Sequence, residues 1–354
     1  MTPPVPPRQP DVAHRGARLR GAGGHGWRAV GLLVLAVGLA VAVLASLRFG
    51  SVALSTEAAL GALLDFDGSS EHLIVRRMRL PRTMIGLGAG ASLAVAGAIM
   101  QAATRNPLAG PGILGVNAGA AVAVVTTVHV AGAVTPRSSV WVALAGALTA
   151  ALLVYVIGAA GRSGATPIKL ALAGLVTTAL LESWTSAALV LDRRTLDQVR
   201  FWLAGSLAGG EPELLWQVAP LMLAGIVLAL LLARQLNALA LGDDVARALG
   251  QRTGSVRVAC LGVVVLLAGS AVAVAGPIAF VGLAVPHIAR VLTGPDYRWV
   301  QAYAVVLGPT LLLAADVLGR VVARPSELQV GIVTALLGAP FLVALARRRS
   351  LPSV

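Results

Sequence analysis

The chain has 354 residues, of which 57% are hydrophobic, 12% are charged and 4% are aromatic. Soluble domains carry about 25% charged residues, so this composition excludes an ordinary soluble protein and indicates a chain surrounded by lipid. The net charge of +13 does not indicate nucleic-acid binding, because the basic residues lie in short interruptions between apolar runs and form no stripe with interleaved aromatic residues. We therefore expect an all-α, polytopic membrane protein with no nucleic-acid partner.

Ten apolar runs follow one another along the chain, and a membrane-spanning helix needs about 20 apolar residues. The segment 1–26 before them is rich in Pro, Gly and Arg and is expected to be a disordered cytoplasmic tail. The first run contains a possible signal-peptide cleavage site at Ala40-Val41-Ala42, but it exceeds the roughly 7–15 apolar residues of a signal peptide, so we expect a retained helix. The expected spans are 29–47, 83–104, 113–134, 140–160, 170–191, 214–233, 258–275, 278–292, 302–321 and 330–346. They form one transmembrane domain, 27–349, followed by a cytoplasmic tail, 350–354.

The orientation follows from the basic residues of the connections, which are more numerous on the cytoplasmic side. Ten spans place both chain ends on one side, and that side holds 17 of the 28 lysine and arginine residues. We therefore expect a multi-pass protein of the inner or cytoplasmic membrane, with both termini in the cytoplasm. The other side, with 11 basic residues, is unusually basic for an outer side.

The sequence lacks the usual patterns of covalent chemistry. The only lysine, Lys169, follows Ile168 rather than a glycine, so no phosphate-binding G-x-x-x-x-G-K-[ST] loop is present. The five histidines are scattered, and no G-x-S-x-G nucleophile turn occurs. The sequence therefore predicts a protein that is not an enzyme and has no cofactor and no metal site.

The connection before the second span is strongly basic, with four arginines in the segment 76–82, RRMRLPR. Such a segment binds either lipid headgroups or the acidic residues of an extracytoplasmic partner, because the guanidinium fork suits bidentate carboxylate binding. Arg320, at the outer end of the ninth span, belongs to the same face.

Two cytoplasmic connections carry further patterns. The segment 105–112, RNPLAGPG, contains two prolines and two glycines, which force a non-helical turn. It is either an ordinary tight turn or a gate at the inner mouth of a pathway. The segment 239–254, LALGDDVARALGQRTG, predicts a short helix that ends at Gly250 and whose start Asp243 or Asp244 caps or stabilises by its charge. This helix is either a plain amphipathic loop helix or a surface that a soluble motor subunit grips.

Glu182 is the outstanding charge inside a span, and a carboxylate at the bilayer centre costs about 2.5–3.5 kcal/mol or more. It therefore faces a cavity or pairs with an outer arginine such as Arg193 or Arg194. We expect Asp316 and His287 to make internal packing contacts rather than to bind a ligand.

Six stretches carry a resemblance to a known family: RLPRTMIGLGAGASLAVAGAIMQAATRNPLAGPGILGVNAGA (79–120), LALAGLVTTALLESW (170–184), FWLAGSLAG (201–209), LNALALGDDVARALG (236–250), AGPIAFVGLAVPHIAR (275–290) and ELQVGIVTALLGAPFLVALARRR (327–349). The chain resembles, over residues 29–349, the permease subunits of ABC importers for iron–siderophore complexes, haem and cobalamin. The resemblance implies a type II ABC importer permease fold, a second permease subunit of the same or another kind, two cytoplasmic ATPase subunits and an extracytoplasmic substrate-binding protein. It implies an iron(III)–siderophore cargo, with cobalamin or haem as alternatives. An ion-coupled secondary transporter is the rival of another class, and only Glu182 and Asp316 offer the charges that it needs.

The same resemblance, carried over by position, implies three groups of functional residues. The residues that contact glutamates of the binding protein are Arg79, Arg82 and Arg320. Those of the cytoplasmic gate are Asn106 and Leu108 with Pro167 and Ile168, although relatives often have small polar residues at the last two positions. Those that couple to the ATPase are Leu241, Gly242, Asp243, Asp244, Ala246, Arg247, Leu249 and Gly250. Glu182 stands where relatives have a small residue, and it is a candidate pathway residue.

Overall fold

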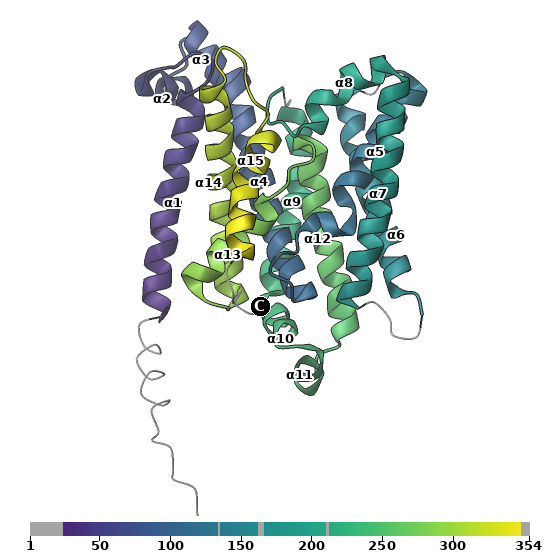
Figure 1. Ribbon diagram of the computed structural model, residues 1–354. Coiled ribbons are helices and arrows are strands. Elements are labelled where there is room, and N and C mark those ends of the chain that lie inside the picture. The colour runs from purple at the N-terminus through teal and green to yellow at the C-terminus, as the bar shows by residue number, and fades with distance from the viewer. Residues whose placement is uncertain (1–23, 134, 162–165, 210–211, 348–354) are drawn as a thin grey trace, which may run out of the picture.

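The computed structural model describes residues 24–133, 135–161, 166–209 and 212–347. In these ranges the secondary structure is helical, with no strand. Long apolar helices stand side by side, and short helices lie at the two ends of the bundle (Figure 1). The all-α, polytopic fold that the sequence predicts is confirmed.

Ten apolar helices form the bundle and match the ten expected spans: α1 (Gly24–Arg48), α4 (Leu80–Thr104), α5 (Val116–Ala131), α6 (Pro136–Ala159), α7 (Pro167–Leu191), α9 (Pro212–Leu231), α12 (Thr253–Ala275), α13 (Val281–Thr293), α14 (Tyr297–Val322) and α15 (Val330–Ala346). The short elements are α2 (Thr56–Leu64), α3 (Ser70–Ile74), the π-helical turn η1 (Val75–Arg79), the 3-10 turn η2 (Pro111–Leu114), α8 (Arg193–Leu203), α10 (Ala233–Ala240) and α11 (Asp243–Ala248). Among the described residues, seven helices are long and apolar enough to cross a membrane, whereas α5, α13 and α15 are apolar but shorter.

Two spans begin later than hydropathy alone suggests. The expected span 113–134 is helical only in α5, because η2 occupies its start and Gly115 has a φ of +70°; Val134 lies outside the described residues. The expected span 278–292 begins at Val281, because Phe280 has a φ of +76° and interrupts the helix. Both interruptions are covered by protein, since η2 packs on α7 and the Phe280 ring packs on α15. Non-helical backbone is tolerated at membrane depth only in such places.

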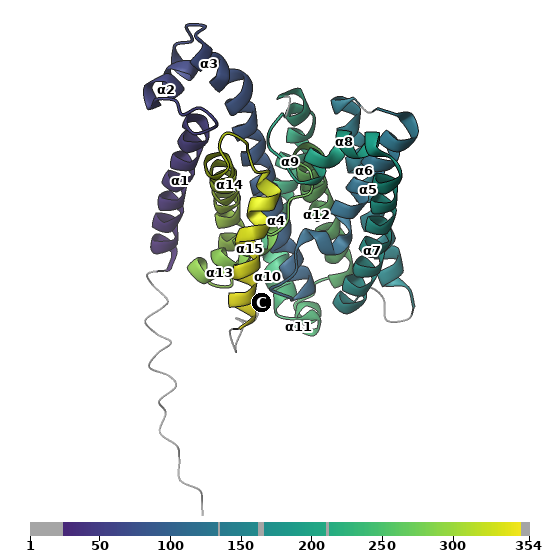
Figure 2. The same ribbon diagram turned by 45° about the horizontal axis from the view of Figure 1, so that its top comes forward.

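Helix α4 lies at the centre of the bundle and contacts α9, α12, α13 and α14 (Figure 2). Most of its side chains are buried. A Cβ atom at Gly90 would lie 2.7 Å from Pro309 Cα on α14, and one at Gly97 would overlap the carbonyl oxygen of Gly282 on α13. Glycine therefore lets the three backbones approach to direct contact, which is the main way that apolar helices associate in lipid.

The short elements define two ends of the bundle. We name them after the expected orientation: the end that carries α2, α3 and α8 is called the outer end, and the end that carries α10 and α11 is called the inner end (Figure 1). Of the expected tails, residues 1–23 and 350–354 lie outside the described residues, while residues 24–26 already belong to α1.

Candidate functional site

A buried ionic cluster lies at the outer end, around Asp316 of α14. Asp316 is fully buried and accepts hydrogen bonds from Arg82 of α4, whose Nη2 lies 2.7 Å from Oδ1. Nη2 of Arg320, one turn further along α14, lies 2.8 Å from Oδ2. Nη1 of Arg82 also donates to Glu327, at 2.6 Å. The cluster joins α4, α14 and the start of the segment before α15, and it confirms that Asp316 makes internal contacts.

Arg320 and a neighbouring arginine, Arg79 of η1, also hold the connection between α1 and α2. Arg79 and Arg320 are 5% and 1% exposed, and their guanidinium groups donate to backbone carbonyl oxygens. The acceptors are those of Leu47, Arg48 and Val52 for Arg79, and those of Ser46 and Phe49 for Arg320. The last carbonyl groups of a helix have no partner within the helix, so these bonds satisfy the outer end of α1.

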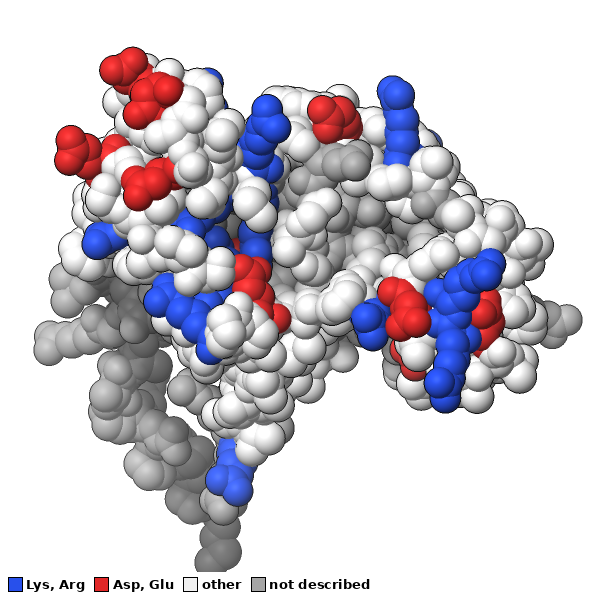
Figure 3. Space-filling model, turned by 90° about the horizontal axis from the view of Figure 1, so that it is seen from above, with Lys and Arg blue, Asp and Glu red and all other residues white. Residues whose placement is uncertain are grey.

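The structure thus brings together Arg79, Arg82 and Arg320, the three arginines implied for docking. Each of them already binds acceptors within the chain. Seen from the outer end, basic and acidic side chains alternate beside a hollow in the surface (Figure 3). A separate group of exposed acidic residues covers the α2–α3 lobe: Glu57, Asp65, Asp67 and Glu71. The pKa of the Asp67 carboxyl group is lowered mainly by the Ser69 N–H, which donates a hydrogen bond to it at 2.8 Å.

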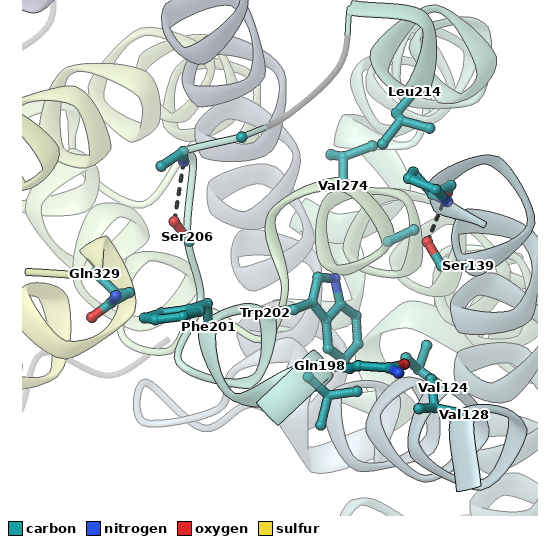
Figure 4. Close-up of a pocket in the computed structure, with 15 residues that line it drawn as sticks. Val124, Val128, Ser139, Gln198, Phe201, Trp202, Ser206, Leu214, Val274 and Gln329 are labelled. Carbon is teal, nitrogen blue, oxygen red and sulfur yellow. Dashed lines mark hydrogen bonds between the residues drawn. The ribbon is translucent and has the colours of Figure 1, made fainter. Parts of the chain in front are cut away.

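A cavity of about 600 Å³ opens at the outer end among α5, α6, α8, α9, α12 and the start of α15. Trp202 of α8 lies at its centre, and Gln198 lies one turn earlier on the same helix (Figure 4). Its wall is otherwise built of apolar side chains and a few neutral polar ones, and no charged side chain is among the described lining residues. The volume is in the range of small-molecule sites. Sequence reasoning did not find this cavity, because it is formed by six segments that are far apart in the chain.

At the inner end, α4 stops at Arg105, which has a φ of +49°. The chain then makes a tight turn, in which Asn106 Oδ1 accepts from the Leu108 N–H at 2.9 Å and the Asn106 carbonyl accepts from the Ala109 N–H at 3.0 Å. Asn106 and Leu108 are exposed at this end. Their polar and apolar side chains are therefore free to line an opening.

The other two candidate gate residues, Pro167 and Ile168, begin α7. The Thr166 side chain caps this helix by accepting from the Lys169 N–H, and Ile168 is 74% exposed. Helix α7 contacts η2, which follows the Asn106 turn. The two candidate gate elements therefore lie on adjoining segments of the inner end.

Helix α11 projects from the inner end and has two different faces. Val245 and Leu249 are 45% and 67% exposed, and their spacing of four places them on one side of the helix. Leu241, which lies before the non-helical Gly242, is 65% exposed as well, whereas Ala246 is fully buried. Of the two expected roles of the aspartates, the cap is not seen, because the N-cap is Gly242 with no side-chain hydrogen bond, whereas Asp243 and Asp244 both lie in the first turn, where their charge stabilises the helix start.

The other expected coupling residues also belong to this helix or border it. Asp243 is the first helical residue, and it pairs with Arg257 of α12 at 2.7 Å. Asp244 is exposed and pairs with Arg247, one turn on, at 3.1 Å. Gly250 follows the helix with a φ of +80°. Sequence reasoning missed Arg257, which it counted only as a cytoplasmic basic residue.

Glu182 lies on an exposed face of α7. The expected pairing with Arg193 or Arg194 is not among the ion pairs and hydrogen bonds of the described residues. Trp184, two residues further on, donates from Nε1 to Thr126 of α5 at 2.9 Å.

Three comparisons with known proteins agree with this arrangement. Residues 38–348 match the FecCD transport family. The chain is 44% identical over 310 residues to the "Probable siderophore transport system permease protein YfiZ" of Bacillus subtilis, which covers 88% of this chain and 93% of that protein. It is 44% identical over 321 residues to the ferric enterobactin transport system permease protein FepD of Escherichia coli. This aligned region covers 90% of this chain and 95% of FepD.

A solved structure of a metal-chelate type ABC transporter in an inward-facing conformation has a TM-score of 0.78 to this fold. The two chains share 26% sequence identity, and their superposition covers 91% of this chain and 99% of the chain in the solved structure. The resemblance that the sequence motifs carry is confirmed: the chain is a multi-pass membrane protein that belongs to the FecCD transport family.

Proposed function

We propose that the chain is the membrane-spanning permease subunit of an ABC importer that carries iron(III)–siderophore complexes across the inner or cytoplasmic membrane. Its similarity to YfiZ and FepD, which are named as siderophore and ferric enterobactin permeases, is the observation that carries this proposal. The subunit does no covalent chemistry, and ATP is hydrolysed by a separate protein. Cobalamin, haem and ion-coupled transport are not favoured.

The two ends of the bundle suit different partners. The exposed apolar face of α11 supports binding of a cytoplasmic ATPase, because contiguous apolar side chains at a water-facing end are typical of interaction sites. Two ATPase subunits and a second permease subunit complete the assembly, and an extracytoplasmic substrate-binding protein docks at the outer end. Both termini are then cytoplasmic.

Transport proceeds by a switch between two conformations. Closure of the ATPase subunits around ATP moves α11 and switches which end of the pathway is open. Asn106, Leu108, Pro167 and Ile168 close the inner mouth in one of these states. The uncharged wall of the outer cavity suits a bulky cargo that must pass without being retained, since the binding protein supplies the affinity. Glu182, on an uncovered face of α7, contributes to cargo preference.

Docking through Arg79, Arg82 and Arg320 requires the carboxylates of the binding protein to replace internal acceptors. Arg82 is best placed for this exchange, because its side chain is 11% exposed whereas that of Arg320 is 2% exposed. Its present partners are Asp316 and Glu327, which a pair of incoming glutamates can replace in kind.

Uptake of radiolabelled iron in a deletion strain tests the cargo. Ferric enterobactin, ferric citrate and a ferric hydroxamate are supplied separately, with labelled cobalamin as the control. We expect uptake of at least one ferric chelate to be lost and to return with the plasmid-borne gene. Unchanged uptake of every ferric chelate, or loss confined to cobalamin, would overturn the assignment.

Charge reversal tests the docking role. Arg79→Glu combined with Arg82→Glu should abolish uptake while the ATPase still co-purifies with the permease. Arg137→Glu is the matched control, because Arg137 is an exposed arginine of the same end that lies outside the cluster. Full uptake by the double variant would refute docking through these arginines.

A further inference from the structure

The helix proposed to receive the motor, α11, meets the bundle through its buried N-cap Gly242, the half-buried Asp243 and the buried Ala246. Beyond the helix, the Gln251 side chain donates to the Gln235 carbonyl at 3.1 Å. A displacement of α11 therefore reaches the rest of the protein through few contacts.

The first of these contacts is an ion pair with α12. Arg257 Nη2 lies 2.7 Å from one oxygen of Asp243 and 3.0 Å from the other. The two side chains are only 14% and 22% exposed, so the pair is shielded from water and stronger than an exposed pair. Arg257 lies near the inner start of α12, and α12 packs along the central helix α4. The pair thus ties α11 to the core of the bundle.

The second contact joins α11 to the turn proposed as the gate. Gly242 is buried and has a φ of +107°, a conformation open almost only to glycine. A Cβ atom there would lie 3.2 Å from Arg105 Nη1, so the Arg105 guanidinium lies directly over the start of α11. Arg105 is the residue that ends α4 and precedes Asn106. The start of α11 therefore touches α12 and the gate turn at once.

We infer that Arg257 and Arg105 are positioning residues that transmit the movement of α11 to α12 and to the turn that begins at Asn106. The inference rests on the proposed function and adds the path by which the motor reaches the gate. The Asp243–Arg257 pair keeps α11 and α12 together when α11 is displaced, because separating the pair leaves charges that are largely shielded from water uncompensated. The Arg105 side chain, resting on Gly242, transfers the same displacement to the end of α4.

The test measures ATP hydrolysis and ferric chelate uptake in the same liposomes, which contain the complete transporter with its ATPase subunits and binding protein. Arg257→Met and Arg105→Met remove one contact each. Arg298→Met is the control, because Arg298 is an exposed arginine of the inner end away from α11. We expect each of the two variants to keep basal ATP hydrolysis, which is measured without binding protein, and to lose at least about fivefold in uptake per ATP, the lower range of coupling between sites. The control should keep the wild-type ratio.

An exchange of charges separates transmission from general stability. Arg257→Asp places a like charge opposite Asp243 and should uncouple the transporter most strongly. Adding Asp243→Arg to it restores the pair in reverse and should recover at least about half of the lost coupling, given that the contact is electrostatic. Wild-type uptake per ATP in Arg257→Met and Arg105→Met, or no recovery in the exchanged pair, would overturn the inference. If wild-type liposomes take up no ferric chelate, the proposed cargo is refuted, but the linkage can still be tested. The readout is then the stimulation of ATP hydrolysis by the binding protein, which both variants should lose.

Discussion

Substitution of Asp316 by asparagine tests whether the outer arginine cluster holds the fold together. The carboxylate is fully buried and lies 2.7 Å from an Arg82 nitrogen and 2.8 Å from an Arg320 nitrogen. An amide removes the negative charge and turns an N–H group toward one of the two guanidinium groups. Breaking a buried ion pair costs about 3–5 kcal/mol, because a charge is left uncompensated. Since two arginines lose their partner here, we expect a loss of at least about 3 kcal/mol.

The measurement is the thermal unfolding of the detergent-purified protein, followed as the fraction that stays monodisperse after heating. A change of 1 kcal/mol shifts the melting temperature by roughly 2–4 °C in chains of 150–250 residues, so Asp316→Asn should lower it by at least about 5 °C. Glu327→Gln is the matched control. Glu327 is 33% exposed and pairs with Arg82 alone, so its loss should cost about 1 kcal/mol or less.

The opposite result is informative as well. The variant keeps Arg79, Arg82 and Arg320 and makes the outer face one charge more positive. If the cluster served only an acidic docking partner, Asp316→Asn would melt like the wild type and bind the partner at least as well. An unchanged melting temperature would therefore refute the internal role of the cluster.

Three further outcomes can be checked. Gly97→Ala should prevent accumulation of folded protein, because the added Cβ atom would overlap the Gly282 carbonyl oxygen on the neighbouring α13. Gly38→Ala on α1, where a Cβ atom has nothing within 4 Å, should express normally. Equal expression of the two variants would contradict the close packing. Glu182→Gln should change the relative uptake of different ferric chelates without changing the melting temperature, because the side chain is exposed and has no partner among the described residues; unchanged preference would make the residue incidental. The pKa of Asp192, the N-cap of α8, is lowered mainly by the hydrogen bond that the Thr195 hydroxyl donates to its carboxylate. This cap therefore stabilises α8 above about pH 4 and is lost as the pH falls through the lowered pKa. The rate of opening of α8, measured by amide hydrogen exchange, should rise only below about pH 4. A rise already between about pH 5 and 7 would exclude this cap as the cause.

Hydropathy predicted the ten bundle helices because lipid offers the backbone no hydrogen-bonding partner, so long apolar runs are helical. It misplaced the starts of α5 and α13, because hydropathy registers only how apolar a segment is. The segments around Gly115 and Phe280 are as apolar as their neighbours, so hydropathy does not register the breaks that their positive φ values make. Whether protein covers such a break depends on the packing of distant helices, which hydropathy does not report.

The candidate sites were predictable to different degrees. The exposed side of α11 follows from the local spacing of Val245 and Leu249, and the turn at Asn106 follows from its prolines and glycines. The partners of the outer arginines could not be found in this way, because Arg82 and Asp316 are 234 residues apart in the chain. The only local signal of the cluster is the spacing of four between Asp316 and Arg320, which places both on one side of a helix.

The two ends of the bundle are held in physically different ways, and this difference favours rigid-body switching over local bending. At the outer end, Arg82 of α4 is fixed to α14 through Asp316, whereas at the inner end Arg105 of the same helix rests on the movable α11. Helix α4 has 25 residues and is therefore about 37 Å long at 1.5 Å per residue. The close contact of Gly90 with α14 leaves no space for α4 to bend separately. Under the proposed mechanism, a force applied at α11 would therefore tilt α4 together with the helices packed on it, and opening of the inner mouth and rearrangement of the outer end would occur in one movement.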